Sequence, residues 1–158
     1  MNDVDAYHEA GHALLAVVLG GRLQSVTIDP AWDDGPARYG DTRVEWHAQR
    51  LTPRELCEKS ILVALAGPVA ERIHRGEAYH PGLVAEWAAD WRLAWAAAES
   101  ILPDEHRRLQ YLERLTVQLE QWLRQDAMWA ALAAIVDELS AHETLDGDQV
   151  AEIVHQWI

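Results

Sequence analysis

The sequence has little cysteine: Cys57 is the single one among 158 residues. One thiol can form neither an internal disulfide nor a zinc site built from several thiolates, so a reducing compartment fits best. Cys57 itself is expected to be a small buried apolar side chain rather than a nucleophile.

Long hydrophobic runs are also lacking. The longest ones, ALLAVVL at 13–19 and AMWAALAAIV at 127–136, are well short of the roughly 20 residues that cross a bilayer. The N-terminal segment MNDVDAYHEAGH is acidic, whereas a secretory signal begins with basic residues. We therefore expect no membrane span, no secretory signal and a cytoplasmic location.

Basic side chains are few as well. The 13 Lys and Arg against 26 Asp and Glu give a formal net charge of −13, which repels phosphate backbones and anionic lipid and argues against nucleic-acid binding. Neutral or basic peptides are the compatible partners. A hydrophobic content of 49% with eight tryptophans excludes a disordered chain, and the length predicts one domain over residues 1–158.

The hydrophobic periodicity predicts an α+β fold that is mainly α-helical, with a small β-sheet and a helical bundle. Alternation predicts two short strands, and proline, aspartate and glycine predict a loop over 30–37. The expected strands are 22–30 and 38–48, and the expected helices are 4–19, 52–74, 80–101, 104–142 with a break near 124–126, and a closing helix within 146–158.

Local signals mark the ends of some helices. Thr52, Pro53 and Glu55 form a start signal, and Gly76 ends that helix after an expected disturbance at Gly67-Pro68. The charged run at 104–115 is interpreted as a solvated helix face.

The segment YHEAGH places His8 and His12 four residues apart on the first predicted helix. Residues at that spacing lie on one face, so both imidazoles can reach one zinc ion. Glu9 is rotated away from the ion and can take a proton from a water bound to it, as metal-assisted peptide hydrolysis requires. The alternative is two partly exposed histidines on an amphipathic helix. Gly11 indicates that another backbone passes close by.

A catalytic zinc site needs a third protein ligand, for which the candidates are His74, His80, Glu86 and Asp90. Asp90 is the first choice, because it is the single polar position in a helical stripe and a buried carboxylate must be paired or metal-bound. The stripe comprises Leu83, Trp87, Asp90, Ala94, Ala97 and Ile101. Glu86 is the second choice, and His80 is also interpreted as an ordinary loop histidine.

Several segments together resemble the zinc peptidase domain of the FtsH-type proteases, which are membrane-anchored AAA proteases. AYHEAGHALLAVVLG is similar to that family's zinc-binding helix, and SVTIDP to the strand after it. ILVALAGPVAERI and HETLDGDQVAEIV resemble its small-residue helix and its C-terminal segment. The resemblance runs in order from about Asp5 to the C-terminus.

The resemblance implies a zinc-dependent metalloendopeptidase acting on flexible or unfolded polypeptides. It assigns His8, His12 and Asp90 as zinc ligands and Glu9 as the base. Glu71 resembles the glutamate of the family's Ala-Glu pair; it either orients a ligand or is an ordinary helix-surface residue. Where the family has asparagine and threonine around the ligand aspartate, this chain has Ala89 and Trp95.

No phosphate-binding GxxxxGK[ST] pattern occurs, so a peptidase activity would be ATP-independent unless a separate ATPase partner supplies the motor. The sequence is also compatible with a homo-oligomer. Because of the changes near Asp90, we keep as an alternative a non-hydrolytic binding or regulatory module that retains the metal site. A structural metal is a third alternative. Asp146-Gly147 resembles the LDG of intramembrane metalloproteases, but a turn that caps the closing helix is favoured.

Overall fold

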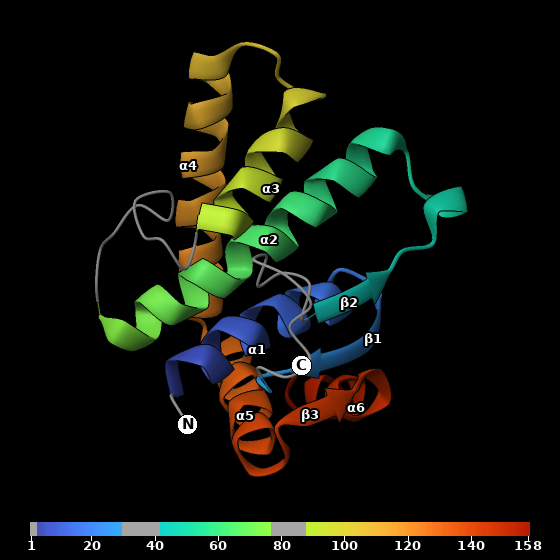
Figure 1. The fold of residues 1–158 in the computed structure, drawn as a ribbon, viewed down its shortest axis with the longest axis vertical. Helices are drawn as coiled ribbons and strands as arrows, with labels where there is room; N and C mark the ends of the chain where they lie inside the picture. Colours follow the sequence, from blue (N-terminus) through green and yellow to red (C-terminus); the bar gives the residue numbers. More distant parts are fainter. Residues whose placement is uncertain (1–2, 30–41, 77–87) are drawn as a thin grey trace.

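The structure is a computed structural model, and it describes residues 3–29, 42–76 and 88–158. Two layers are visible in Figure 1: the long helices α2, α3 and α4 lie above α1, and the sheet lies beside α1 with α5 and α6 below it. The elements are α1 (Asp3–Val18), β1 (Arg22–Thr27), β2 (Thr42–Glu45), the 3-10 helix η3 (Ala48–Arg50), α2 (Pro53–Arg75), α3 (Ala88–Glu99), α4 (Glu105–Leu123), α5 (Asp126–His142), β3 (Thr144–Asp146) and α6 (Gly147–Trp157).

These elements confirm the predicted mainly α-helical α+β class. They also confirm the helix at the N-terminus, the two short strands and the division between α4 and α5. The predicted loop at 30–37, the first residues of the second strand and the first residues of the helix at 80–101 lie outside the described residues.

The sheet joins the two ends of the chain. Its strand order is β2-β1-β3, and both pairings are antiparallel. β3 was not predicted; it pairs Asp146 with Ser25 and Leu145 with Val26. Asp146 then caps α6 through a capping box with Gln149, which confirms the predicted turn and makes β3 and α6 one continuous unit.

The helix α2 begins and ends as its sequence predicts. Thr52 and Glu55 form the capping box, and Gly76 has a left-handed φ of 71° at the C-cap. The expected disturbance at Gly67-Pro68 does not break the helix, which continues through Pro68. Proline removes one backbone donor, and the surrounding burial from Val63 to Glu71 holds this segment helical.

The helices α1 and α2 pack closely in antiparallel directions. A Cβ on Gly11 would lie 2.5 Å from the backbone oxygen of Ala66 and 2.9 Å from the Cβ of Ala70. Only glycine permits this approach, which confirms the inference from Gly11 that another backbone passes nearby.

The core is apolar and centred on α1, α2 and α5, with side chains from α3, α4, α6, β1 and β3 completing it. Its largest fully buried apolar side chains are Leu14, Leu15, Ile61, Leu65, Leu112, Leu123, Leu132, Ile135, Leu139 and Leu145.

One part of the charged run at 104–115 is not a solvated face. Arg108 is buried, donates hydrogen bonds to the backbone oxygens of Leu102 and Pro103, and lies over the ring of Trp95. The interpretation of the run as solvated is therefore wrong for Arg108, whose guanidinium holds the connection between α3 and α4.

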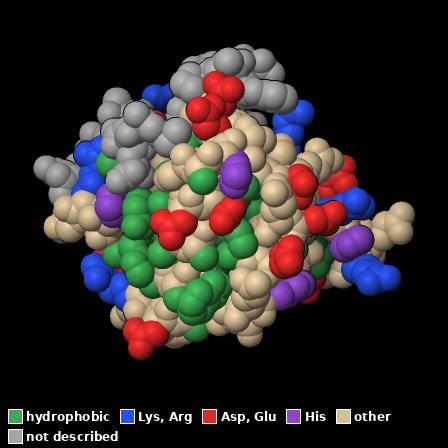
Figure 2. Space-filling model, turned by 90° about the horizontal axis from the view of Figure 1, so that it is seen from below, with side chains coloured by type: hydrophobic (Ala, Val, Ile, Leu, Met, Phe, Trp, Pro, Cys, Tyr) green, Lys and Arg blue, Asp and Glu red, His purple; other side chains and the backbone are tan. Residues whose placement is uncertain are grey.

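On the surface, acidic side chains are spread over the face that Figure 2 shows, while Lys and Arg stand nearer its edges. No helix within the described ranges is both long and apolar enough to span a bilayer.

Candidate metal centre

The helix α1 brings two imidazoles together on its buried face. The Nε2 atoms of His8 and His12 lie 3.2 Å apart, and the two rings meet edge to face. His8 is 3% exposed, and His12 is fully buried. The alternative of two partly exposed histidines is therefore wrong.

The orientation of His12 is fixed by α2. The Nδ1 of His12 donates a hydrogen bond of 2.7 Å to the backbone oxygen of Val63. In the neutral imidazole this leaves the lone pair on Nε2, the atom that faces His8. Gly67 makes room for the ring, because a Cβ at that position would overlap the His12 imidazole. Sequence reasoning noted Gly67 as a helix disturbance and missed this role.

The third group comes from α3. Asp90 is fully buried, and its Oδ2 lies 2.8 Å from His8 Nε2 and 3.4 Å from His12 Nε2. Asp90, Ala94 and Ala98 are the buried residues of α3, so the carboxylate does lie on an apolar face. Among the described residues, neither Asp90 oxygen has a partner with good hydrogen-bond geometry.

The three facing atoms fit a zinc ion. Their separations of 2.8, 3.2 and 3.4 Å are close to the roughly 3.3 Å that separates ligand atoms about 2.0–2.1 Å from a tetrahedral zinc. They are also the one group of three potential ligands found close together in the part of the chain that the structure describes. Two nitrogen donors and one carboxylate leave a fourth tetrahedral position for a further ligand.

The charges within this group favour a proton on the imidazole, so a metal ion has to compete with protons for the site. Burial is the largest single effect and lowers the pKa of His12, but the Asp90 carboxylate, helped by Glu9 and the Val63 oxygen, outweighs burial and raises this pKa to about 9. Burial raises the pKa of the Asp90 carboxyl, while His12 and His8 outweigh it and hold this pKa well below its ordinary range. In the absence of a cation the pair is therefore charged at neutral pH, and a metal must displace the proton.

Glu9 is also at the site. It follows His8 on α1, is fully buried, and its charge contributes to the raised pKa of His12. Glu71 of α2 is another buried carboxyl group, at 3% exposure, so the reading of Glu71 as a helix-surface residue is wrong. Glu9 and Asp90 are thus buried beside two imidazoles, and buried carboxylates are stable when they are paired or metal-bound.

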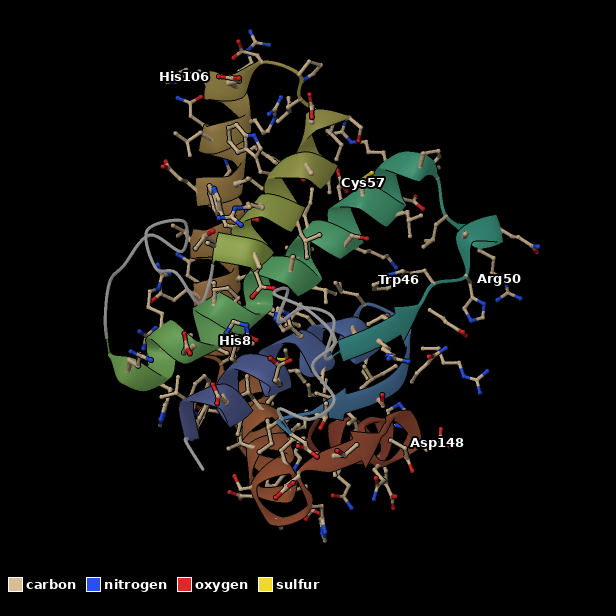
Figure 3. All side chains as sticks on the ribbon, viewed as in Figure 1. His8, Trp46, Arg50, Cys57, His106 and Asp148 are labelled. Carbon is tan, nitrogen blue, oxygen red and sulfur yellow. The ribbon has the colours of Figure 1, made fainter. Side chains whose placement is uncertain are left out.

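The remaining candidates are not part of this group. The ring of His74 stacks on Tyr7, with centroids 3.8 Å apart, and it is not among the clustered ligands. His80 and Glu86 lie outside the described residues. Cys57 is partly exposed rather than buried, and its Sγ lies 3.4 Å from Ser100 Oγ; Figure 3 shows it far along α2 from His8.

No family model matches the sequence. The ATP-dependent zinc metalloprotease FtsH of Acidimicrobium ferrooxidans is 27% identical over 184 aligned positions. The match covers 96% of this chain and 27% of that protein, so the chain spans about a quarter of the length of the curated relative. These comparisons support a distant relationship to FtsH.

Proposed function

We propose that this chain is a zinc-dependent metallopeptidase domain that hydrolyses peptide bonds in flexible or unfolded polypeptides. The single observation that carries the proposal is the triangle formed by His8, His12 and Asp90, whose separations match a zinc coordination sphere. The distant match to a protein named as a zinc metalloprotease supports the same chemistry.

In this proposal each residue has a separate task. His8, His12 and Asp90 hold the zinc, which when bound supplies Lewis acidity toward a peptide carbonyl and toward water. Glu9 takes a proton from the attacking water and delivers it to the leaving amine. The Val63 oxygen keeps His12 in the tautomer that presents Nε2.

The partners follow from the same reasoning and are proposals as well. The matched segment is about a quarter of FtsH, and no phosphate-binding GxxxxGK[ST] pattern occurs in this sequence. Peptides that are already unfolded are the proposed substrates, and folded substrates would need an ATPase. The edge strand β2 offers backbone groups for a peptide, since it has a strand partner on one side only among the described residues.

The test compares wild-type protein with Glu9→Gln. Zinc content is measured by mass spectrometry, and cleavage is followed on unfolded casein. We expect both proteins to hold zinc, while the variant loses activity by about 100-fold or more, because general-base catalysis contributes about 10²–10⁴-fold. Equal cleavage by the two proteins would remove Glu9 as the base.

One observation favours the alternative of a non-hydrolytic module that keeps the metal. The side chains of the site are at most 3% exposed, so a substrate has little access to them; they are His8, Glu9, His12 and Asp90. A zinc-loaded protein that cleaves no peptide of a varied library, yet binds a peptide partner, would favour this alternative. If the metal is structural, chelation should unfold the domain; under the catalytic proposal chelation stops turnover and leaves the helix content intact.

A further inference from the structure

Lys59, in the first half of α2, makes two contacts outside its own helix. Its Nζ donates a hydrogen bond of 2.7 Å to the backbone oxygen of Leu19, and it lies 5.8 Å from the centroid of the Trp46 ring. Leu19 directly follows α1, and Trp46 directly follows β2; Figure 3 shows Trp46 below the N-terminal half of α2. Lys59 therefore connects α2 with the end of the histidine-bearing helix and with the edge strand.

The Trp46 ring also lies against the turn that follows α1. A Cβ on Gly21 would lie 2.9 Å from Trp46 Cζ3 and 2.8 Å from Val44 Cγ1, so the ring and the strand are both in direct contact with this turn. Gly21 is itself tied to α1, because its N–H donates a hydrogen bond of 2.8 Å to the Ala16 oxygen. The end of β2 is thus packed against the end of α1, with Lys59 over the ring.

Both contacts of the Lys59 ammonium group are electrostatically favourable. Backbone oxygens at the C-terminal end of a helix carry partial negative charge, and hydrogen bonds from a charged donor are about twice as strong as neutral ones. An ammonium group within about 6 Å of a tryptophan centroid adds a cation–π attraction. Lys59 is half-buried, so solvent weakens these contacts less than at an exposed position. Loss of the ammonium group should therefore loosen Trp46 and the strand before it.

The position of β2 matters for a peptide that pairs with it. Main-chain hydrogen bonds hold neighbouring strands about 4.7–4.9 Å apart and in a defined register, so such a peptide takes its place from β2. Peptide hydrolysis requires the reacting atoms to approach within about 3–3.5 Å. A peptide carbonyl can be presented to α1 reproducibly only if β2 is itself held in a fixed place relative to that helix.

We infer that Lys59 is a positioning residue for the peptide: it holds Trp46, and thereby the edge strand β2, in a fixed place against the end of α1. The inference rests on the proposed function, in which β2 receives the peptide. Lys59 acts through Trp46 rather than on the reacting atoms. Its loss should therefore weaken peptide binding and leave zinc affinity unchanged.

NMR of the metal-free protein reads the contact between Lys59 and Trp46 directly. Lys59 is the single lysine of the sequence, so its side-chain signals need no assignment by mutation. The ring current of Trp46 should shift the ε-methylene signal of Lys59 upfield, and Trp46→Leu should remove this shift. An ε-methylene signal at the position of a free lysine in the wild type would overturn the inference.

Peptide binding is measured by the anisotropy of a fluorescein-labelled unfolded casein fragment. Each variant is made in the zinc-loaded Glu9→Gln background, so that cleavage does not interfere. We expect Lys59→Met to raise the Kd by about 10-fold, a factor that the loss of one charged hydrogen bond can supply. Lys59→Arg should restore most of the affinity, because a guanidinium group donates hydrogen bonds and also stacks on an indole.

Arg54→Met is the control on the same helix, because its side chain is 66% exposed and pairs with Glu58; its Kd should match that of the Glu9→Gln protein. An unchanged Kd in a folded Lys59→Met protein would overturn the inference. So would a parent protein that binds no casein fragment, because β2 would then receive no peptide.

Gly21→Ala displaces the same strand without changing Lys59. Its added Cβ would require Val44 and Trp46 to move, so the Kd should rise in this variant as well. Gly21→Ala decides the matter if Lys59→Met does not fold. An unchanged Kd in Gly21→Ala would show that the position of β2 does not control binding.

Kinetics of the active protein separate positioning from a general loss of structure. With Glu9 in place, Lys59→Met should raise the KM for casein by about 10-fold and leave kcat and zinc affinity at the wild-type values. A lower kcat with an unchanged KM, or weaker zinc binding, would overturn the inference.

Failure of this inference can be told apart from failure of the peptidase proposal. If the wild type binds zinc and the casein fragment but cleaves nothing, the peptidase proposal is wrong, and the Kd values still decide the role of Lys59. If Glu9→Gln abolishes cleavage while Lys59→Met changes neither KM nor Kd, the role of Lys59 alone is wrong.

Discussion

His12 donates through Nδ1 to the backbone oxygen of Val63 at 2.7 Å, and this bond ties the first helix to the second at the metal-binding group. Gly67 lies one turn further along α2 and leaves the space that the His12 ring occupies. The position of a proposed ligand therefore depends on a residue that has no side chain.

Replacing Gly67 by alanine should displace the His12 ring. The added Cβ would overlap the imidazole, so we expect a loss of stability of about 1–3 kcal/mol from overpacking together with weaker zinc binding. Thermal unfolding and zinc competition measure the two effects. Gly76→Ala is the matched control, because it is strained by its φ of 71° but contacts nothing near the site. Zinc affinity that falls equally in both variants would contradict this role of Gly67.

Asp90→Asn should remove a zinc ligand. We expect the affinity to fall by more than about 100-fold, since residues that merely support ligands already contribute about 10–100-fold. Zinc content after dialysis provides the measurement, with the exposed Asp137→Asn as control. Glu86→Gln is made in parallel. If Glu86→Gln loses zinc while Asp90→Asn retains it, the third ligand is Glu86 and not Asp90.

The metal-stripped protein should have a characteristic pH profile. Folding raises the pKa of His12 from 6.5 to about 9, so the stability from this group is fully present below pH 6.5 and is lost as the pH rises toward 9. Folding lowers the pKa of Asp90, so its contribution is present above its ordinary pKa near 3.8 and is lost as the pH falls. The Tm in excess chelator should therefore decline from pH 6.5 to 9.

Asp90→Asn supplies the control for this profile. Without the carboxylate, only the weaker charge of Glu9 still opposes burial at His12, so the decline should be much shallower. A variant that retains the wild-type decline would show that another group causes it. Zinc binding, which displaces the proton, should strengthen over the same pH range.

Arg108→Ala should loosen the connection between α3 and α4. Arg108 donates to the oxygens of Leu102 and Pro103 and lies over Trp95, and hydrogen bonds from a charged group contribute about 1.5–3 kcal/mol each. We expect a clear drop in Tm with a change in tryptophan fluorescence. Arg108→Lys should restore little, because an ammonium group cannot reproduce the planar contact. Full recovery with lysine would indicate that charge alone matters.

Much of this arrangement could be predicted from local sequence. The spacing of His8 and His12 places two imidazoles on one helix face, and Thr52 and Asp146 begin helices because capping is a property of a few adjacent residues. Asp90 was selected as a polar position in an apolar stripe, and its place beside the imidazoles depends on how α3 packs across α2.

Features that depend on distant contacts could not be predicted. β3 is only three residues long and exists because Leu145 and Asp146 meet β1, so no alternating pattern marks it. Arg108 looks like any residue of a charged helix until Trp95 is placed beside it. The room that Gly67 leaves becomes visible only when the His12 ring lies against it.

The glycine contact between α1 and α2 has a consequence for metal choice. Gly11 against Ala66 sets a close spacing of these helices, and α2 at this spacing fixes the His12 ring through the Val63 oxygen and the space at Gly67. A ligand group held in this way has little freedom to widen around calcium, whose ligand distances of about 2.3–2.6 Å are longer than those of zinc and which prefers oxygen donors to imidazole nitrogens.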